Sequence, residues 1–288
     1  MIAISQLEFK ARHFSHVALA GGGNRCWWQA GFLDVFLSQV ATKPKQLIGA
    51  SAGAAIATAV VTDRVRQSLE AAAQKFEETT RNFEWRLLAR GERPFAMPRI
   101  YPEWIKSFLS ASDWPLFKSN PIKVDVVITR PLPGLPVSLS TLLALGLYTT
   151  EKFWLKNFHP RLPHWMGLRA EHLDLSGAKD LETAHAYLLA TAAAVPITPV
   201  HRVHDRPALD GGFYDSVPLP KDRQHDEHTL VLLTRHQASK PHVFELGRRI
   251  YVQPSATVAA KNFDCTDGVS IRSTYLQGKQ DAQALFGC

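Results

Sequence analysis

Residues 47–56 read Leu-Ile-Gly-Ala-Ser-Ala-Gly-Ala-Ala-Ile, an apolar run followed by a stretch of small residues. Gly49 and Gly53 stand two positions before and two positions after Ser51, and this spacing lets the backbone turn sharply from a strand into a helix. Such a turn exposes the serine hydroxyl at the start of the helix. The pattern therefore predicts a nucleophile elbow with Ser51 as nucleophile, although a small-residue helix packed tightly on a sheet has the same local sequence.

A glycine-rich loop lies upstream of this turn, directly after the apolar run of residues 14–20. Apolar side chains recur at helical spacing over residues 32–40, so the segment indicates one strand–helix–strand unit. The two strands of such a unit lie parallel, which brings the loop and Ser51 to the same edge of the sheet. We expect the loop to form an oxyanion hole with its backbone N–H groups. Its residues are Gly21, Gly22, Gly23, Asn24 and Arg25.

A nucleotide or metal site is a poorer interpretation of this chain. A dinucleotide fingerprint needs a third glycine where Cys26 stands and an acidic residue where Lys43 and Lys45 stand, and no Gly-Lys-Ser/Thr phosphate loop occurs. His201 and His204 are spaced like metal ligands, but no third well-spaced ligand accompanies them. We therefore expect neither a cofactor nor a metal ion.

A candidate base for the serine stands in the run Ala-Leu-Asp-Gly-Gly-Phe at residues 208–213. Asp210 ends a short apolar segment, and Gly211 and Gly212 permit a tight turn that aims its carboxylate into a cleft. An Asp-Gly pair by itself is commonly no more than a turn. The prediction that Asp210 serves Ser51 therefore depends on the other two motifs.

In this order, the motifs Gly-Gly-Gly-x-Arg, Gly-x-Ser-x-Gly and Asp-Gly-Gly resemble those of the patatin-like phospholipase family. Gly31, residues 192–196 and residues 217–219 match further family positions, so the resemblance covers most of residues 14–235. It implies acyl-ester hydrolysis by a Ser51–Asp210 dyad that works without histidine and passes through an acyl-enzyme. The implied substrates are phospholipids, lysophospholipids or other acyl-ester lipids.

Three positions depart from the family pattern. Cys26 stands where the family usually has glycine, which leaves the loop conformation open because cysteine lacks glycine's dihedral freedom. Ser216 replaces a common asparagine, and Thr191 replaces a common serine. The resemblance gives Arg25 a role in shaping the loop or meeting a phosphate, and an ion pair on the helix is an equally good interpretation.

Two other function classes stay open. A Ser-His-Asp esterase is less favoured, because the elbow follows a single strand–helix unit and no His-Gly-Gly loop precedes it. A non-catalytic lipid-binding or scaffolding relative would have lost turnover through the altered glycine loop, and the intact Ser51 and Asp210 favour an enzyme over it. Acyl transfer to an alcohol is a variant that the sequence does not exclude. The triad histidines to test are His201, His204, His225, His228, His236 and His242.

The order of the remaining elements predicts the fold. Apolar runs indicate strands at residues 122–128, 229–234 and 249–253. Helical spacing indicates helices at residues 181–194 and 271–286. Alternating strands and helices favour a three-layer α/β/α sandwich with a mainly parallel central sheet. The chain has 288 residues, 45% of them hydrophobic, and no internal repeat or linker, so we expect a single domain over residues 1–288.

Residues 81–118 differ in composition, because aromatic side chains are mixed with seven basic and four acidic ones. A stripe at helical spacing runs through Tyr101, Trp104, Ile105, Phe108 and Leu109. Such a stripe usually faces a core, and we favour that interpretation. The alternative is a cap over an acyl pocket that also touches lipid, since aromatic and basic side chains suit a membrane interface.

Charge and composition limit the partners. The net charge of +7 suits attraction to an anionic membrane surface, and peripheral contact is therefore a hypothesis. No nucleic-acid motif or dense basic run occurs, so no nucleic-acid partner is expected. Three cysteines without a pairing pattern and an N-terminus interrupted by charges predict a cytoplasmic protein. The longest apolar run, residues 47–61, is too short and too polar to span a bilayer. The oligomeric state is not indicated.

Overall fold

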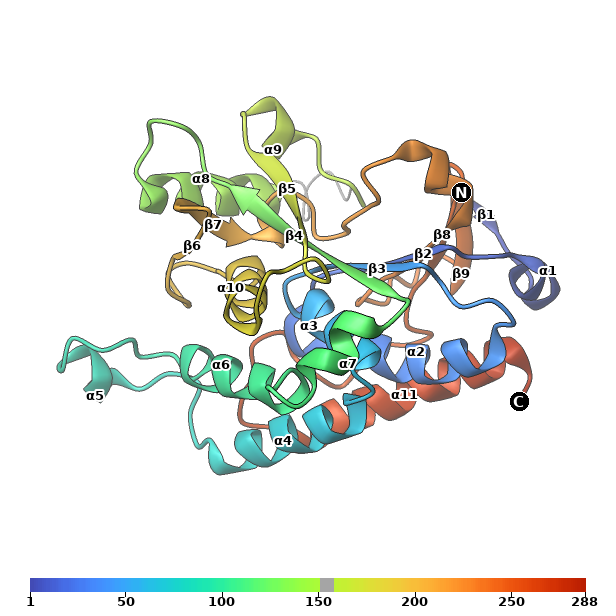
Figure 1. Ribbon diagram of the computed structural model, residues 1–288, viewed down its shortest axis with the longest axis horizontal. Coiled ribbons are helices and arrows are strands. Elements are labelled where there is room, and N and C mark those ends of the chain that lie inside the picture. The colour runs from blue at the N-terminus through green and yellow to red at the C-terminus, as the bar shows by residue number, and fades with distance from the viewer. Residues whose placement is uncertain (151–157) are drawn as a thin grey trace.

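The computed structural model describes residues 1–150 and 158–288 (Figure 1). Within these ranges ten strands form one sheet in the order β1-β9-β10-β8-β2-β3-β4-β7-β6, and β5 pairs with β4. The strands are β1 (Ile2–Ala3), β2 (His16–Leu19), β3 (Gln46–Ala50), β4 (Lys123–Arg130), β5 (Arg169–Asp174), β6 (His201–Val203), β7 (Arg206–Asp210), β8 (Thr229–Leu232), β9 (Val243–Leu246) and β10 (Arg249–Val252).

The centre of the sheet is parallel. Strands β10, β8, β2, β3 and β4 run in one direction, whereas the pairings that involve β1, β9, β5, β7 and β6 are antiparallel. Strands β2 and β8 are buried along their whole length, as expected for parallel strands that are covered on both faces. The predicted parallel centre is therefore confirmed, with antiparallel edges added to it.

Helices cover both faces of the sheet, which confirms the predicted three-layer sandwich. In Figure 1, α2, α3 and α10 lie on one side with α4, α6, α7 and α11 outside them, and α8 and α9 lie on the other side. The α-helices are α1 (Gln6–Ala11), α2 (Trp27–Gln39), α3 (Ala52–Val61), α4 (Val65–Glu78), α5 (Trp85–Leu88), α6 (Met97–Phe108), α7 (Trp114–Ser119), α8 (Val137–Thr150), α9 (Leu162–Trp165), α10 (Leu181–Thr191) and α11 (Gly268–Phe286). Short 3-10 segments include η1 (Gly23–Cys26) and η3 (Gly211–Phe213).

The predicted strands and helices agree with these bounds to within a few residues. The helix predicted over residues 181–194 ends earlier, at Thr191. The last helix begins earlier than predicted, because the Asp267 side chain accepts a hydrogen bond from the Ser270 N–H (2.9 Å) and caps the first turn. No helix in the described ranges is both long enough and apolar enough to cross a membrane.

Two glycines let α2 and α11 pack closely. A Cβ atom at Gly31 would lie 1.9 Å from the Tyr275 carbonyl oxygen, and one at Gly278 would lie 2.0 Å from the Trp28 carbonyl oxygen. Only glycine fits at such a close crossing. Because α2 follows η1 directly, this crossing also fixes the position of the glycine-rich loop.

Candidate active site

Ser51 stands at the sharp turn between β3 and α3, as the elbow prediction requires. Its φ of 54° is in the left-handed region, which a residue other than glycine seldom occupies. Gly49 lies in β3, and Gly53 lies in the first turn of α3, where an added Cβ would sit 2.6 Å from the Leu19 carbonyl oxygen. The helix can therefore begin close against β2 and carry Ser51 at the sheet edge.

Strand β4 aligns Asp210 with the serine. Ala50, the last residue of β3, pairs with Val127, and Asp210 at the end of β7 pairs with the next residue, Ile128. Strand β5 occupies the other edge of β4 along this stretch, so β7 lies on the β3 side, beyond the end of β3. The antiparallel strand thus delivers the carboxylate to the point where the chain leaves the sheet at Ser51.

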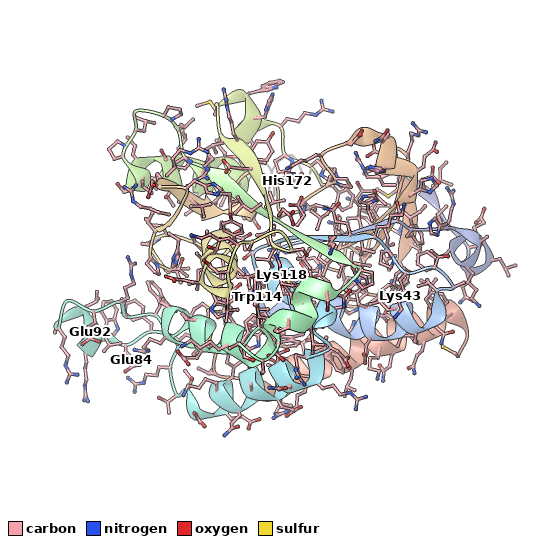
Figure 2. The ribbon with its side chains drawn as sticks, in the orientation of Figure 1. Lys43, Glu84, Glu92, Trp114, Lys118 and His172 are labelled. Atoms are coloured by element: carbon pink, nitrogen blue, oxygen red, sulfur yellow. The ribbon has the colours of Figure 1, made fainter. Side chains whose placement is uncertain are left out.

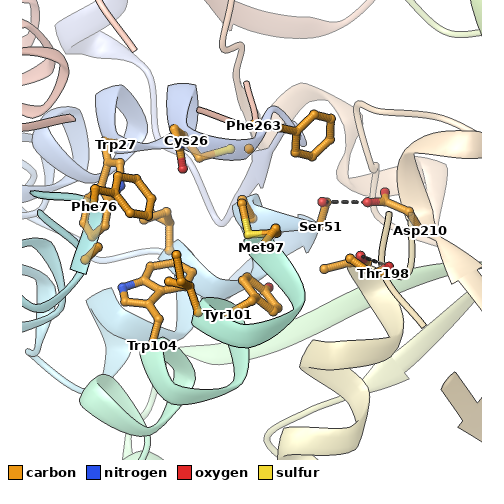
Figure 3. A pocket seen from close by; sticks show the side chains of 17 residues that line it. Cys26, Trp27, Ser51, Phe76, Met97, Tyr101, Trp104, Thr198, Asp210 and Phe263 are labelled. Carbon is orange, nitrogen blue, oxygen red and sulfur yellow. Dashed lines mark hydrogen bonds between the residues drawn. The ribbon is translucent and has the colours of Figure 1, made fainter. Parts of the chain in front are cut away.

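The two predicted residues are in direct contact. Ser51 Oγ donates a hydrogen bond to Asp210 Oδ2 at 2.7 Å, and the Gly212 N–H donates to Asp210 Oδ1 at 2.7 Å (Figure 3). Gly211 and Gly212 form η3, the tight turn expected after the aspartate. Burial raises the pKa of Asp210 to about 6, and the hydrogen bonds from Ser51 and Gly212 oppose this shift. Asp210 is therefore more basic than an ordinary aspartate.

Thr191 holds the elbow in place. The Ser51 N–H donates to Thr191 Oγ1 (2.9 Å), and this hydroxyl donates to the Val127 carbonyl oxygen (2.5 Å). The threonine lies at the end of α10 and is fully buried. Many family members have serine at this position, and threonine retains the hydroxyl group. Sequence reasoning noted the substitution but gave no sign of this contact with the elbow.

The glycine-rich loop lies beside Ser51, and its amides have different partners. The N–H of Gly21 donates to Ser216 O (2.7 Å), that of Asn24 to Asn262 O (3.0 Å), and that of Arg25 to Gly22 O (3.3 Å). Among the described residues the Gly23 N–H has no acceptor, whereas the Gly22 backbone makes a hydrogen bond to the Cys26 thiol. Next to the nucleophile, the loop thus has one N–H group without a partner among the described residues and one whose acceptor is a weakly accepting sulfur atom.

Cys26 does not need glycine's dihedral freedom. Its φ of −65° and ψ of −14° are those of a right-handed helix, which any residue adopts. Its side chain is buried, and Sγ contacts the Ala20 carbonyl oxygen at 3.5 Å. Burial raises the pKa of the thiol to about 12. The departure from the family pattern is thus compatible with the fold of the loop.

Arg25 has no ion pair among the described residues, and its buried Nε atom has no hydrogen-bond partner there. Burial lowers the pKa of Arg25 to about 10, and the neighbouring Arg235 adds to this effect. Both arginines line a side cavity, and the described residues of its wall include no Asp or Glu. The structure therefore does not support an ion pair as the role of Arg25.

Two other cavities meet at the catalytic pair. Both are lined by Gly23, Ser51, Asp210 and Phe263. The first cavity is mainly apolar and includes Ile56, Ala72, Phe76, Met97, Ile100, Tyr101 and Trp104 (Figure 3). The second cavity runs along the glycine-rich loop and connects to the side cavity at Gly21, Arg25, Tyr148 and Ser216.

The aromatic stripe of residues 81–118 packs on the core, the interpretation that the sequence favours. Ile105, Phe108 and Leu109 are buried, and the partly buried Trp104 donates from Nε1 to the Ser68 carbonyl oxygen (3.0 Å). Tyr101 is buried too, and its face of α6 forms a wall of the first cavity. The stripe therefore faces the core and the first cavity.

No histidine takes part in the catalytic contact. All twelve histidines fall within the described residues, and none has a hydrogen bond to Ser51 or Asp210. His159 instead contacts Asp215 (2.7 Å) and the Tyr251 hydroxyl (2.7 Å). No group of three or more His, Cys, Asp or Glu side chains in the described ranges is placed to hold a metal ion.

A three-layer fold with these motifs at one sheet edge agrees with comparisons to known proteins. The chain belongs to the patatin-like phospholipase family, whose model matches residues 17–221. This membership supports acyl hydrolysis of lipid esters as the general activity. Among solved structures, the crystal structure of VipD from Legionella pneumophila is similar, with a TM-score of 0.45 and 11% identity over 96% of this chain and 67% of that chain. No curated protein matches the sequence.

Proposed function

We propose that this protein hydrolyses fatty-acyl ester bonds of phospholipids or lysophospholipids, with Ser51 as nucleophile and Asp210 as general base. The observation that carries the proposal is the 2.7 Å hydrogen bond from Ser51 Oγ to a carboxylate whose pKa is raised to about 6. A base with this pKa is mostly ionised at neutral pH and still accepts a proton more readily than an ordinary aspartate.

In the acylation step, Asp210 accepts the hydroxyl proton while Ser51 Oγ attacks the ester carbonyl carbon. The N–H groups of Gly22 and Gly23 donate to the oxyanion of the tetrahedral intermediate. The bond to the alcohol oxygen then breaks, and Asp210 returns the proton to that oxygen. The alcohol leaves, and the acyl group stays on Ser51.

In the deacylation step, a water molecule takes the place of the alcohol. Asp210 accepts a proton from this water, whose oxygen attacks the acyl carbonyl carbon. The same two N–H groups bind the second oxyanion. Collapse of the intermediate releases the fatty acid, and the proton passes from Asp210 to Ser51 Oγ.

The two cavities suit the two halves of such a substrate. The apolar first cavity would take the acyl chain, and the second cavity would take the alcohol and its head group. Arg25 and Arg235, which line the side cavity together, favour an alcohol that carries a phosphate. Arg235→Gln should lower kcat/KM for a lysophospholipid about tenfold relative to a monoacylglycerol with the same chain, and an unchanged ratio would exclude this role.

Peripheral membrane contact is a further part of the proposal, and α8 suits it best. Its residues Ser140, Thr141 and Ala144 are buried, whereas three of its five leucines are exposed to solvent. Residues 130–150 and 158–170 contain no Asp or Glu, which suits an anionic surface. The segment around α5, residues 81–96, mixes Glu84 and Glu92 with arginines (Figure 2), whereas α8 itself carries no charged residue. The exposed leucines of α8 are Leu139, Leu142 and Leu145.

Single substitutions test the catalytic pair. Ser51→Ala and Asp210→Asn should each reduce ester hydrolysis by several orders of magnitude while leaving the circular dichroism spectrum unchanged. Replacing each of the six candidate triad histidines by glutamine, one at a time, should change kcat/KM by no more than about tenfold. Loss of a true triad histidine would lower it by several orders of magnitude. A folded Asp210→Asn protein with most of its activity would rule out the dyad, and one inactive histidine variant would favour a triad.

A further inference from the structure

The first cavity has a reactive end and an aromatic end. Figure 3 shows the Ser51–Asp210 hydrogen bond at one end and Trp27, Phe76 and Trp104 gathered at the other. These three side chains come from α2, α4 and α6, and we call them the aromatic wall. Trp27 and Phe76 are each 3% exposed and Trp104 is partly buried, so the wall is backed mainly by the protein core.

The aromatic wall is held in place by its own contacts. Trp104 donates from its indole Nε1 to the Ser68 carbonyl oxygen of α4 at 3.0 Å. Its ring meets Trp27 edge to face at a centroid distance of 5.6 Å, and meets Phe108 in the same manner at 5.0 Å. Edge-to-face pairs and a bonded indole N–H restrict side-chain movement. The wall therefore ends the cavity at a fixed distance from Ser51.

The sides of the cavity between these ends are apolar. Ile56, Ala72, Met97 and Ile100 line it, and Asp210 at the reactive end is its only charged lining residue among those described. Each methylene of an alkyl chain that enters such a space gains about fourfold in binding, which corresponds to the transfer free energy of one CH₂ group. This gain stops where the terminal methyl group reaches the aromatic wall, since overpacking is unfavourable.

We propose that the aromatic wall sets an upper limit on the length of the acyl chain that this protein cleaves efficiently. The preferred substrates are then esters whose acyl chain just reaches the aromatic wall, and longer chains are cleaved less efficiently. The inference rests on the proposed function, because it assigns the acyl chain to the first cavity. Beyond the proposed function, the inference assigns chain-length specificity to Trp27, Phe76 and Trp104.

A series of monomeric esters with increasing acyl length tests this inference. For the unmodified protein, kcat/KM should rise about fourfold per methylene, reach a maximum and then fall. Trp104→Ala should move the maximum to longer chains, because it opens the end of the cavity. Ala72→Leu should move the maximum to shorter chains, because it fills part of the side. The maximum is compared within each variant, so the variants need not have equal absolute rates.

The control is Trp85→Ala, which removes a tryptophan that is 74% exposed on α5 and does not line the cavity. It should leave the maximum where it is. A rate that rises through the longest chains, or a maximum that neither Trp104→Ala nor Ala72→Leu moves, would overturn the inference while leaving the dyad intact. Absence of hydrolysis for every ester in the series would instead contradict the proposed function.

Discussion

Ser51 and Asp210 each adopt a state that an isolated residue avoids. The left-handed φ of Ser51 costs on the order of 1–3 kcal/mol. The raised pKa of Asp210 reflects the cost of removing its carboxylate from water. The N–H contact to Thr191, the Ser51 hydroxyl and the Gly212 amide hold both residues in these states.

The pH dependence of hydrolysis follows from the pKa of Asp210. The base acts as the carboxylate, so kcat/KM should rise with pH through a single ionisation near pH 6 and level off above it. An aspartate of ordinary pKa would place this rise near pH 4. A pH–rate profile on a neutral soluble ester measures the midpoint, and full activity at pH 4.5 would contradict the account.

The contribution of Asp210 to folding stability should fall with rising pH, whereas kcat/KM should increase. The folded pKa of Asp210 is raised above its unfolded value of 3.8, so its stabilising contribution is present below that value and is lost as the pH rises through about 6. Asp210→Asn should therefore raise the melting temperature at pH 8, but not at pH 4, relative to the unmodified protein. A lowered melting temperature at pH 8 would argue against a desolvated carboxylate.

At the scale of elements, the sequence predicts the strands and helices whose pattern is local. Strands β2, β4, β8 and β10 are apolar runs, and α10 and α11 show helical spacing. Strand β5 reads Arg-Ala-Glu-His-Leu-Asp and is half-exposed, so no apolar run marks it. The place of β7 beyond the end of β3 depends on its pairing with β4, which no local pattern encodes.

The crossing of α2 and α11 gives a prediction for stability. Gly31→Ala should lower the melting temperature by several degrees, because its Cβ would lie 1.9 Å from the Tyr275 carbonyl oxygen and overpacking costs about 1–3 kcal/mol. Gly146→Ala is the matched control, since a Cβ in this α8 position meets nothing within 4 Å. Equal melting temperatures for the two variants would show that the crossing is looser than described.

Helix α8 gives a prediction for membrane contact. Leu139→Ser combined with Leu142→Ser should weaken binding to anionic vesicles severalfold, because it removes exposed apolar surface beside the second cavity. Leu276→Ser on α11 removes an equally exposed leucine elsewhere and should have little effect. Vesicle co-sedimentation provides the measurement. Equal binding by the unmodified protein, the double variant and Leu276→Ser would show that α8 does not contact the membrane.

At the scale of the whole molecule, the carboxyl ends of β2 and β3 and the end of β7 meet at one edge of the sheet, and each carries one of the three motifs. The meeting of the glycine loop and the elbow was predictable, because they share a strand–helix–strand unit, whereas the place of β7 was not. The support from Thr191, the burial of Arg25 beside Arg235 and the aromatic wall were not predictable either, since each depends on residues far apart in the chain.

The most direct test of the catalytic pair is covalent labelling with a fluorophosphonate, followed by peptide mass spectrometry. Ser51 Oγ should displace fluoride and form a bond to phosphorus, with the label confined to the peptide that contains Ser51. Asp210→Asn should slow this labelling by at least about a hundredfold, since general-base catalysis contributes that much. Labelling at the unmodified rate in Asp210→Asn, or a label on any residue other than Ser51, would contradict the account.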